Sequence, residues 1–279
     1  MNARALWVVL ETVHGVTYFT RQARAAHEAG GMRGFWRGYV ATRAAPLGAA
    51  GLGAVTAVFY NFAPSFLARS LPSIWSVVPP ERALAARAEG AVTALRTYLP
   101  DLAGDPRLPE ATDLLRRLVS DVQWEGRPLG AANAALPWPQ DPVAALWQAA
   151  TTLREHRGDG HVAALLTAGL DGVEAHVLRD AEDGSGESIL PNRGWTGEDW
   201  SAARSRLADR GLLDGSELTE RGRHLRAQIE QRTDALAESA YRAATPEELA
   251  WLDDFLRPYA RRLVPAAVPH PNPVGNPPP

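Results

Sequence analysis

The chain has 279 residues, 46% of them hydrophobic and 22% charged, a balance that predicts a folded globular protein with a sizeable core. Its 29 basic residues, all of them arginine, face 32 acidic ones. The net charge of −3 therefore gives no sign of a general nucleic-acid or membrane-surface binder. Because lysine and cysteine are both absent, the sequence excludes lysine and thiol catalysis, disulfides and cysteine-ligated metal centres.

The first helix is predicted from apolar residues that recur at steps of three and four between Leu6 and Val16. The apolar run at its start is short and ends at Glu11, whereas a signal peptide needs a longer apolar region and a small-residue cleavage site. We therefore expect a cytoplasmic protein.

An uncharged stretch of 25 residues, 44–68, is long enough to cross a bilayer. It contains Pro46, Pro64 and several glycines, and much of the remainder is alanine, which contributes little transfer free energy. This composition favours a fully buried helix over a membrane span.

Helical periodicity continues through most of the chain, and no long run alternates with period two, so the sequence predicts an all-α, mainly helical fold. Further helices are expected at 84–95, 110–122, 141–156, 160–168 and 172–180. We expect a Gly/Ser-rich loop to lead from there to residue 195, and residues 264–279 to form a proline-rich disordered tail.

The second half has the element order of a winged helix-turn-helix. Thr196, with Asp199 three residues later, begins a helix that ends at Gly211, and residues 212–218 form a short β-hairpin wing. Thr219 opens a long helix, and residues 245–248 begin a final helix to about Leu263. We expect a helical domain over 1–140 that contributes to a buried pocket, a winged-helix module over 141–237, and a helix over 238–263 that packs back.

Residues 210–213 followed by 218–223 resemble the end of the recognition helix and the wing of a MarR-type regulator. Other stretches resemble a largely uncharacterised actinobacterial group of SalK-type helix-turn-helix proteins: 11–14, 42–48, 59–62, 126–129, 153–161 and 193–195. The resemblance covers residues 3 to 260. It implies a helical fold with an embedded winged helix, and little about function.

The charges of the candidate recognition helix, residues 198–210, cancel one another. They are Arg204, Arg206 and Arg210 against Glu198, Asp199 and Asp209. The wing carries Asp214 and Glu217 and no basic residue, although winged helices bind phosphate with Arg and Lys at this place. This pattern favours a structural or dimerisation role for the winged helix, with DNA binding as the alternative.

The densest polar cluster, residues 154–161, is predicted to form the corner between two helices. Asp159 would cap the second helix, and the dipole of that helix would lower the pKa of His161, so that a neutral imidazole could act as a base. The alternative is a corner of exposed ion pairs.

Other polar residues lie among apolar ones. Glu11 and His14, at i and i+3, predict a hydrogen-bonded pair in the core, with a metal triad that includes His161 as the alternative. Arg43, once buried, needs an anionic partner from the protein or from a ligand.

These observations predict a small-molecule-binding protein, plausible as an enzyme of specialised metabolism that acts on an acidic or polar molecule, with the winged helix as scaffold. The alternative is a ligand-responsive, MarR-like DNA-binding regulator. The sequence leaves open whether the chain forms a homodimer, and it does not identify a cofactor. We expect no membrane partner and no metal. The catalytic candidates are His161, His14 and His156, and the ligand-binding candidates are Arg43, Tyr60, Asn61, Asn133, Arg157 and Asp159.

Overall fold

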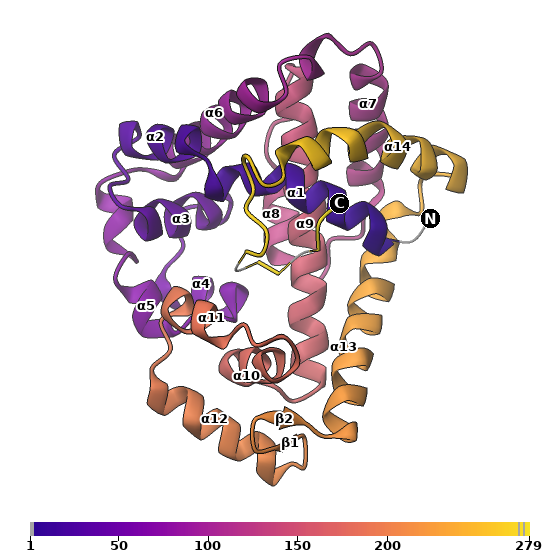
Figure 1. The fold of residues 1–279 in the computed structure, drawn as a ribbon. Coiled ribbons are helices and arrows are strands. Elements are labelled where there is room, and N and C mark those ends of the chain that lie inside the picture. Colours follow the sequence, from indigo (N-terminus) through magenta and orange to yellow (C-terminus); the bar gives the residue numbers. More distant parts are fainter. Residues whose placement is uncertain (1–2, 273, 276) are drawn as a thin grey trace.

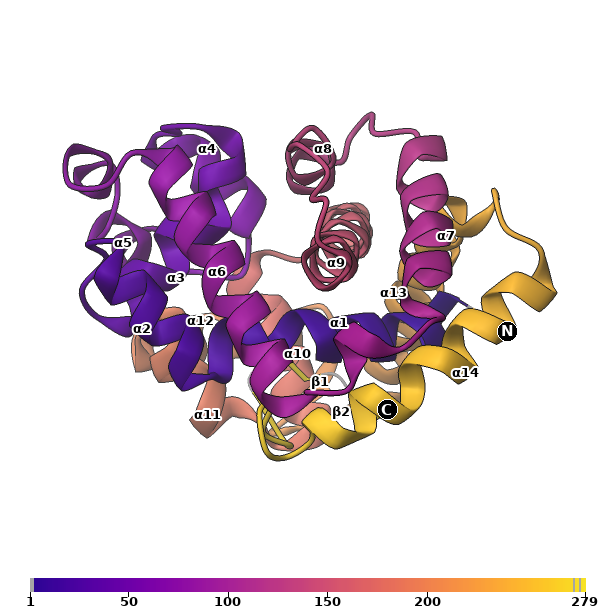
Figure 2. The same ribbon diagram turned by 90° about the horizontal axis from the view of Figure 1, so that it is seen from above.

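The computed structural model describes residues 3–272, 274–275 and 277–279. This part of the chain is mainly helical with one small two-stranded antiparallel sheet, as the periodicity predicts. The long helix α9 (Pro142–Thr167) runs through the middle of the molecule (Figure 1). Seen from above, α9 is viewed nearly end-on, with α8 beside it and α1 crossing close by (Figure 2).

The other elements form two groups: the helices before α9, which span 5 to 19 residues, and the helices after α9, which flank the hairpin. The first group is α1 (Ala3–Phe19), α2 (Arg21–Ala29), α3 (Phe35–Ala44), α4 (Leu52–Phe59), α5 (Pro64–Ala68), α6 (Pro80–Tyr98), α7 (Leu108–Asp121) and α8 (Pro128–Ala134). The second is α10 (Gly172–Asp183), α11 (Gly186–Arg193), α12 (Gly197–Asp209), β1 (Leu213–Asp214), β2 (Glu217–Leu218), α13 (Glu220–Glu238) and α14 (Pro246–Leu263).

The helix starts predicted in the second half are confirmed. Thr196 caps α12 and Thr245 caps α14, and each forms a capping box with a carboxylate three residues later. The Thr219 side chain accepts a hydrogen bond from the Gly222 N–H at the start of α13. The hairpin pairs residues 213–214 with 217–218. The predicted loop before α12, however, contains the helix α11.

The predicted helix break at residues 158–160 is wrong, because α9 continues through it. Gly160 allows close packing there instead of a turn, because a Cβ on it would collide with Nη1 of Arg127. That guanidinium donates hydrogen bonds to the backbone oxygens of His156 (2.8 Å) and Leu236 (3.0 Å). Asp159 therefore caps no helix, and His161 lies in a helix interior, away from any N-terminal dipole.

The expectation that the uncharged stretch 44–68 forms one fully buried helix is wrong. It folds into a 3₁₀ turn at 45–47 and the two short helices α4 and α5, with Pro64 in the first turn of α5. Gly48 has a φ of +72°, so the chain turns where a side chain would be strained. No helix in the described ranges is long and apolar enough to cross a membrane.

The described part of the chain has three apolar cores, two of which include residues of α9. The first joins α1, α6, α7 and α14 to the first half of α9, where Trp147 is fully buried. The second lies among α3 to α6, and the third joins α10, α12 and the hairpin to the end of α9 and α13. Ala267 and Val268, at the start of the proline-rich tail, are buried in the first core. Residues 273 and 276 of that tail lie outside the described residues.

Candidate ligand-binding cavity

A cavity of about 210 Å³, which we call the inner chamber, lies where α3, α4, α9, α10, α11 and α13 meet. Its aromatic wall is formed by Tyr39, Phe59 and Phe62. Its arginines are Arg43, Arg154, Arg179, Arg193 and Arg226. Among the described residues that line it there is no aspartate or glutamate, so the groups that face a ligand there are cationic or neutral.

A second cavity of about 410 Å³, the outer chamber, adjoins the first and shares Gly158, His161 and three of the arginines with it. It lies between α1, α9, α10 and α13, and residues 274, 275 and 277 of the tail form part of its wall. Figure 1 shows the tail passing in front of α1 and α9. Acidic side chains such as Glu230 also line this chamber, so its charge is mixed.

A buried ion-pair network forms one wall. Glu155, only 2% exposed, contacts Arg43 through two hydrogen bonds of 3.0 and 3.1 Å and Arg154 at 2.8 Å. Arg154 also contacts Glu11 at 3.2 Å. Burial would raise the pKa of Glu155, but Arg154 and Arg43 hold it well below its usual range. The anionic partner predicted for Arg43 is thus a carboxylate of the protein itself.

Arg193 carries the clearest electrostatic signal. Its guanidinium lies over the Phe62 ring, 4.7 Å from the centroid. Burial lowers the pKa of Arg193; Tyr39 opposes that shift, and the positive charges of neighbouring arginines, Arg43 first among them, add to it. A group whose charged form is disfavoured by neighbouring cations would be stabilised by an anion, so the inner chamber suits an anionic ligand.

His161 lies on the wall of both chambers, and its tautomer follows from its partner. The Thr233 hydroxyl donates its proton to the backbone oxygen of Ile229 at 2.8 Å. It must therefore accept the 3.0 Å hydrogen bond from Nδ1–H of His161, which leaves Nε2 as the acceptor nitrogen. Burial lowers the pKa of His161, so the ring is neutral at pH 7. The cause is burial and not the predicted helix dipole.

The α12 arginines lie outside the cavity and contact groups on α10 and in the turn just before it. Arg206 contacts Glu174 at 2.9 Å and Asp171 at 2.7 Å. Arg210 donates to the backbone oxygen of Gly169 at 2.9 Å, and Arg204 contacts Asp180 at 3.4 Å. Asp214 and Glu217 at the hairpin are exposed. This surface offers few unengaged cations.

The Helix-turn-helix family matches the chain over residues 3–269. The chain belongs to this family. No curated protein and no solved structure matches it. For this helix-turn-helix protein, the chemistry of the chambers and of the α12 surface is therefore the guide to function.

Of the predicted site residues, the fold of this helix-turn-helix protein brings Arg43, Asn61 and His161 to the inner chamber and Arg157 to the outer one. Arg157 contacts Asp234 at 2.7 Å. The backbone oxygen of Asn61 accepts a hydrogen bond from Trp195.

The other predicted residues lie away from both chambers. His14 is held between the hydroxyls of Thr151 and Tyr18, each at 2.9 Å, and the Tyr60 hydroxyl donates to the backbone oxygen of Leu170. His156, whose pKa burial lowers to about 4, packs edge-on against Trp124.

Two further predicted residues take part in backbone and guanidinium contacts. The Asp159 carboxylate accepts the Gly130 N–H at 2.8 Å, and burial raises the pKa of Asp159 to about 7. Asn133 accepts a hydrogen bond from Arg87 at 3.1 Å.

The predicted pairing of Glu11 with His14 is not found. Glu11 accepts hydrogen bonds from Trp7 (3.1 Å) and Arg154 (3.2 Å), while His14 contacts hydroxyl groups. Within the described ranges, no group of three His, Cys, Asp or Glu side chains is arranged to hold a metal ion.

Four residues of the inner chamber are not among the site residues that the sequence predicts: Arg179, Arg193, Arg226 and His176. They lie on three different helices of the second half, and only Arg193 falls in a stretch that carries the family resemblance, 193–195. His176 donates its Nε2–H to the backbone oxygen of Asn61 at 3.1 Å, and burial lowers its pKa to about 3. The one sequence feature that could have pointed to them is that all 29 basic residues of the chain are arginine.

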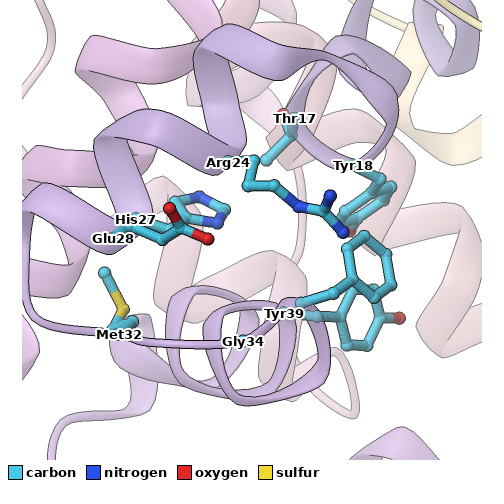
Figure 3. A pocket seen from close by; sticks show the side chains of 9 residues that line it. Thr17, Tyr18, Arg24, His27, Glu28, Met32, Gly34 and Tyr39 are labelled. Carbon is cyan, nitrogen blue, oxygen red and sulfur yellow. The ribbon is translucent and has the colours of Figure 1, made fainter.

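A small cavity of about 10 Å³ lies beside the inner chamber, with Tyr39 on the wall of both. Figure 3 shows its lining, with the guanidinium of Arg24 directed toward Tyr18 and with His27 next to Glu28. This volume is about that needed for one water molecule, so the cavity is too small for an organic ligand.

Proposed function

We propose that this helix-turn-helix protein binds a small anionic molecule in the two chambers. The observation that carries the proposal is the lining of the inner chamber, where five arginines and an aromatic wall face the space and no described carboxylate does. Guanidinium groups bind carboxylate and phosphate in bidentate fashion, and the low dielectric constant of a protein interior strengthens that attraction. Ligand pockets combine apolar walls with a few such polar groups.

His161 extends the proposal to the ligand's chemistry. Its neutral Nε2 would accept a proton or hydrogen bond from a hydroxyl group placed beside the anionic group. In the catalytic form of the proposal, His161 is the general base of a metabolic enzyme, and the arginines orient an acidic substrate. A SalK-type enzyme of specialised metabolism is the finer form of the same proposal.

Calorimetric titration with citrate, 3-phosphoglycerate and sulfate, and with neutral glycerol as the reference, tests the binding. Arg179→Gln and Arg226→Gln should each weaken anion binding about tenfold, since each removes a charged donor. Arg206→Gln on α12 is the matched control and should bind like the wild type. Equal affinity of the wild type for the anions and glycerol, or unchanged binding by both cavity variants, would contradict the proposal.

The catalytic form needs a separate test once a substrate has been identified. His161→Gln should then abolish turnover while anion binding persists, because glutamine cannot act as a base at this position. Undiminished turnover would remove His161 from the mechanism and leave the binding proposal intact.

Family membership favours a second function, that of a ligand-responsive DNA-binding regulator. We infer that α10 to α13 and the hairpin form a MarR-like winged helix with α12 in the recognition position, and a two-fold dimer belongs to this reading. Against it, the α12 arginines contact carboxylates and carbonyl groups of their own module, and the hairpin carries exposed acids.

Fluorescence anisotropy with duplex DNA from 50 to 200 mM salt tests this second function. A working winged helix binds DNA non-specifically with dissociation constants of about 10⁻⁴ to 10⁻⁶ M, and salt weakens that binding steeply. The charge-reversed double variant Asp214→Lys, Glu217→Lys should bind DNA more tightly if the hairpin meets phosphate. No binding by the wild type and no gain in the variant would exclude DNA contact by this surface.

A further inference from the structure

A groove of about 230 Å³ lies on another side of α9 and shares no lining residue with the two chambers. It is bounded by α6, by residues 136–139 after α8, and by the start of α9, and Figure 2 shows α6 facing α8 and α9 across this part of the molecule. Its walls are apolar: Leu84, Ala85, Ala88, Leu136, Pro137, Pro139, Ala144 and Trp147. Arg87 and Gln148 are the polar residues that line it.

Arg87 is a buried cation that has only neutral contacts. Its side chain is on α6, and the residue is 4% exposed. Nη1 donates to the backbone oxygen of Thr42 at 3.3 Å and Nη2 to the Asn133 side chain at 3.1 Å, while the guanidinium lies 5.3 Å from the ring centroid of Trp147. Nε has no hydrogen-bond partner, and no carboxylate in the described part of the chain forms an ion pair with Arg87.

This pattern differs from that of Arg43 and Arg157, two other buried arginines. Arg43 and Arg157, 12% and 7% exposed at their side chains, each contact a carboxylate. Burial lowers the pKa of Arg87 to about 10, with Tyr18 and Glu155 opposing that shift, so its guanidinium is still charged at neutral pH. A buried charge without a contacting counter-ion is costly, and a carboxylate brought by a ligand would offset this cost.

We propose that the groove is a second binding site, for a small apolar carboxylate whose carboxylate group contacts Arg87 and whose hydrocarbon body lies along Leu84, Leu136 and Trp147. Its volume is just below the roughly 300–1,000 Å³ of usual ligand pockets, so the ligand is of benzoate or hexanoate size. Asn133 is a positioning residue, because it accepts from Arg87 and its backbone oxygen accepts from Gln148 at 2.9 Å.

Calorimetric titration of the full chain with benzoate and hexanoate, against benzamide and hexanamide, tests the site. The carboxylates should bind at least about tenfold more tightly than the amides of the same shape, because only they form charge-assisted hydrogen bonds with Arg87. Arg87→Met should abolish this preference. Arg82→Met, the same substitution at an exposed position of α6, is the matched control and should leave it unchanged.

A second variant covers the event that Arg87→Met does not fold, which circular dichroism would show. Ala85→Leu keeps Arg87 and adds bulk at an exposed helix position on the groove wall, so it should weaken binding of acid and amide alike. Arg179→Gln should leave benzoate binding unchanged, which separates this site from the chambers. Equal binding of carboxylate and amide, no binding by the wild type, or wild-type affinity in both groove variants would overturn the proposal.

Discussion

The arginines around α9 and those on α12 have the same chemistry in opposite surroundings. Arg43 and Arg154 are 12% exposed at their side chains and share the buried Glu155, whereas Arg206 is 46% exposed and its partner Asp171 is exposed as well. Buried pairs break at high cost when one partner is lost, while exposed pairs contribute little. Local burial, which the charge pattern of the sequence does not reveal, therefore decides how much an ion pair contributes to the free energy of unfolding.

The strongest test of this contrast removes the shared carboxylate. Glu155→Gln should lower the free energy of unfolding by about 3–5 kcal/mol, because two buried guanidiniums lose their common counter-ion. Urea denaturation monitored by circular dichroism measures the loss. Glu198→Gln on the exposed face of α12 is the control. A loss in Glu155→Gln no larger than in the control would remove the distinction between the two regions.

A pair of glycine variants tests the packing on two sides of α9. Gly160→Ala should lower the free energy of unfolding by about 1–3 kcal/mol, because its methyl group would displace the Arg127 guanidinium from its two carbonyl contacts. A Cβ on Gly158 would lie 3.6 Å from its nearest neighbour, which is an ordinary contact. Gly158→Ala should therefore stabilise the helix by up to about 1 kcal/mol. Thermal unfolding of both variants measures these changes, and an equal change in stability in the two variants would contradict the role assigned to Gly160.

The buried histidines predict an acid-sensitive fold. The pKa of His176 is about 3 in the folded protein, against its usual 6.5, so between these values the unfolded chain binds more protons and stability falls as pH falls. His176→Gln should reduce this slope by up to about 1.4 kcal/mol per pH unit. His224→Gln, at an exposed position, should not. Unfolding curves between pH 6.5 and 4.5 measure both, and parallel slopes in all three proteins would refute the prediction.

The smallest effect is expected on the α12 surface. Arg206→Gln should lower the free energy of unfolding by less than about 1 kcal/mol, because Arg206 is half-exposed and its pair with Asp171 forms at the surface. Its buried partner Glu174 keeps Arg210 as a second cation. Raising the salt concentration should shrink the difference from wild type further. A salt-independent loss of several kcal/mol would show that this pair behaves like those around α9.

The sequence predicted best what short-range chemistry decides. Thr196, Thr219 and Thr245 begin their helices through side-chain contacts that reach only three residues along the chain. Pro64 began a helix for the same local reason, since its missing N–H costs nothing in the first turn.

The rest depended on partners far away in the chain. Residues 158–160 have the composition of a turn, but Arg127, 33 residues before Gly160, packs against them and they remain helical. Arg43 was recognised because it stood beside an uncharged run, whereas nothing in the local sequence of Arg193 or Arg226 pointed to a cavity. Only the folded chain shows that they face one cavity.

The continuity of α9 has a consequence for how the molecule unfolds. Its 26 residues make a rod about 39 Å long, which is built into the first apolar core at one end and the third at the other. Fraying the rod at one end would expose side chains of the core at that end and loosen the wall of the chambers, which ties the loss of one core to that of the other. The two halves are thus expected to lose their structure in a single cooperative transition, with coincident melting curves for tryptophan fluorescence and helicity.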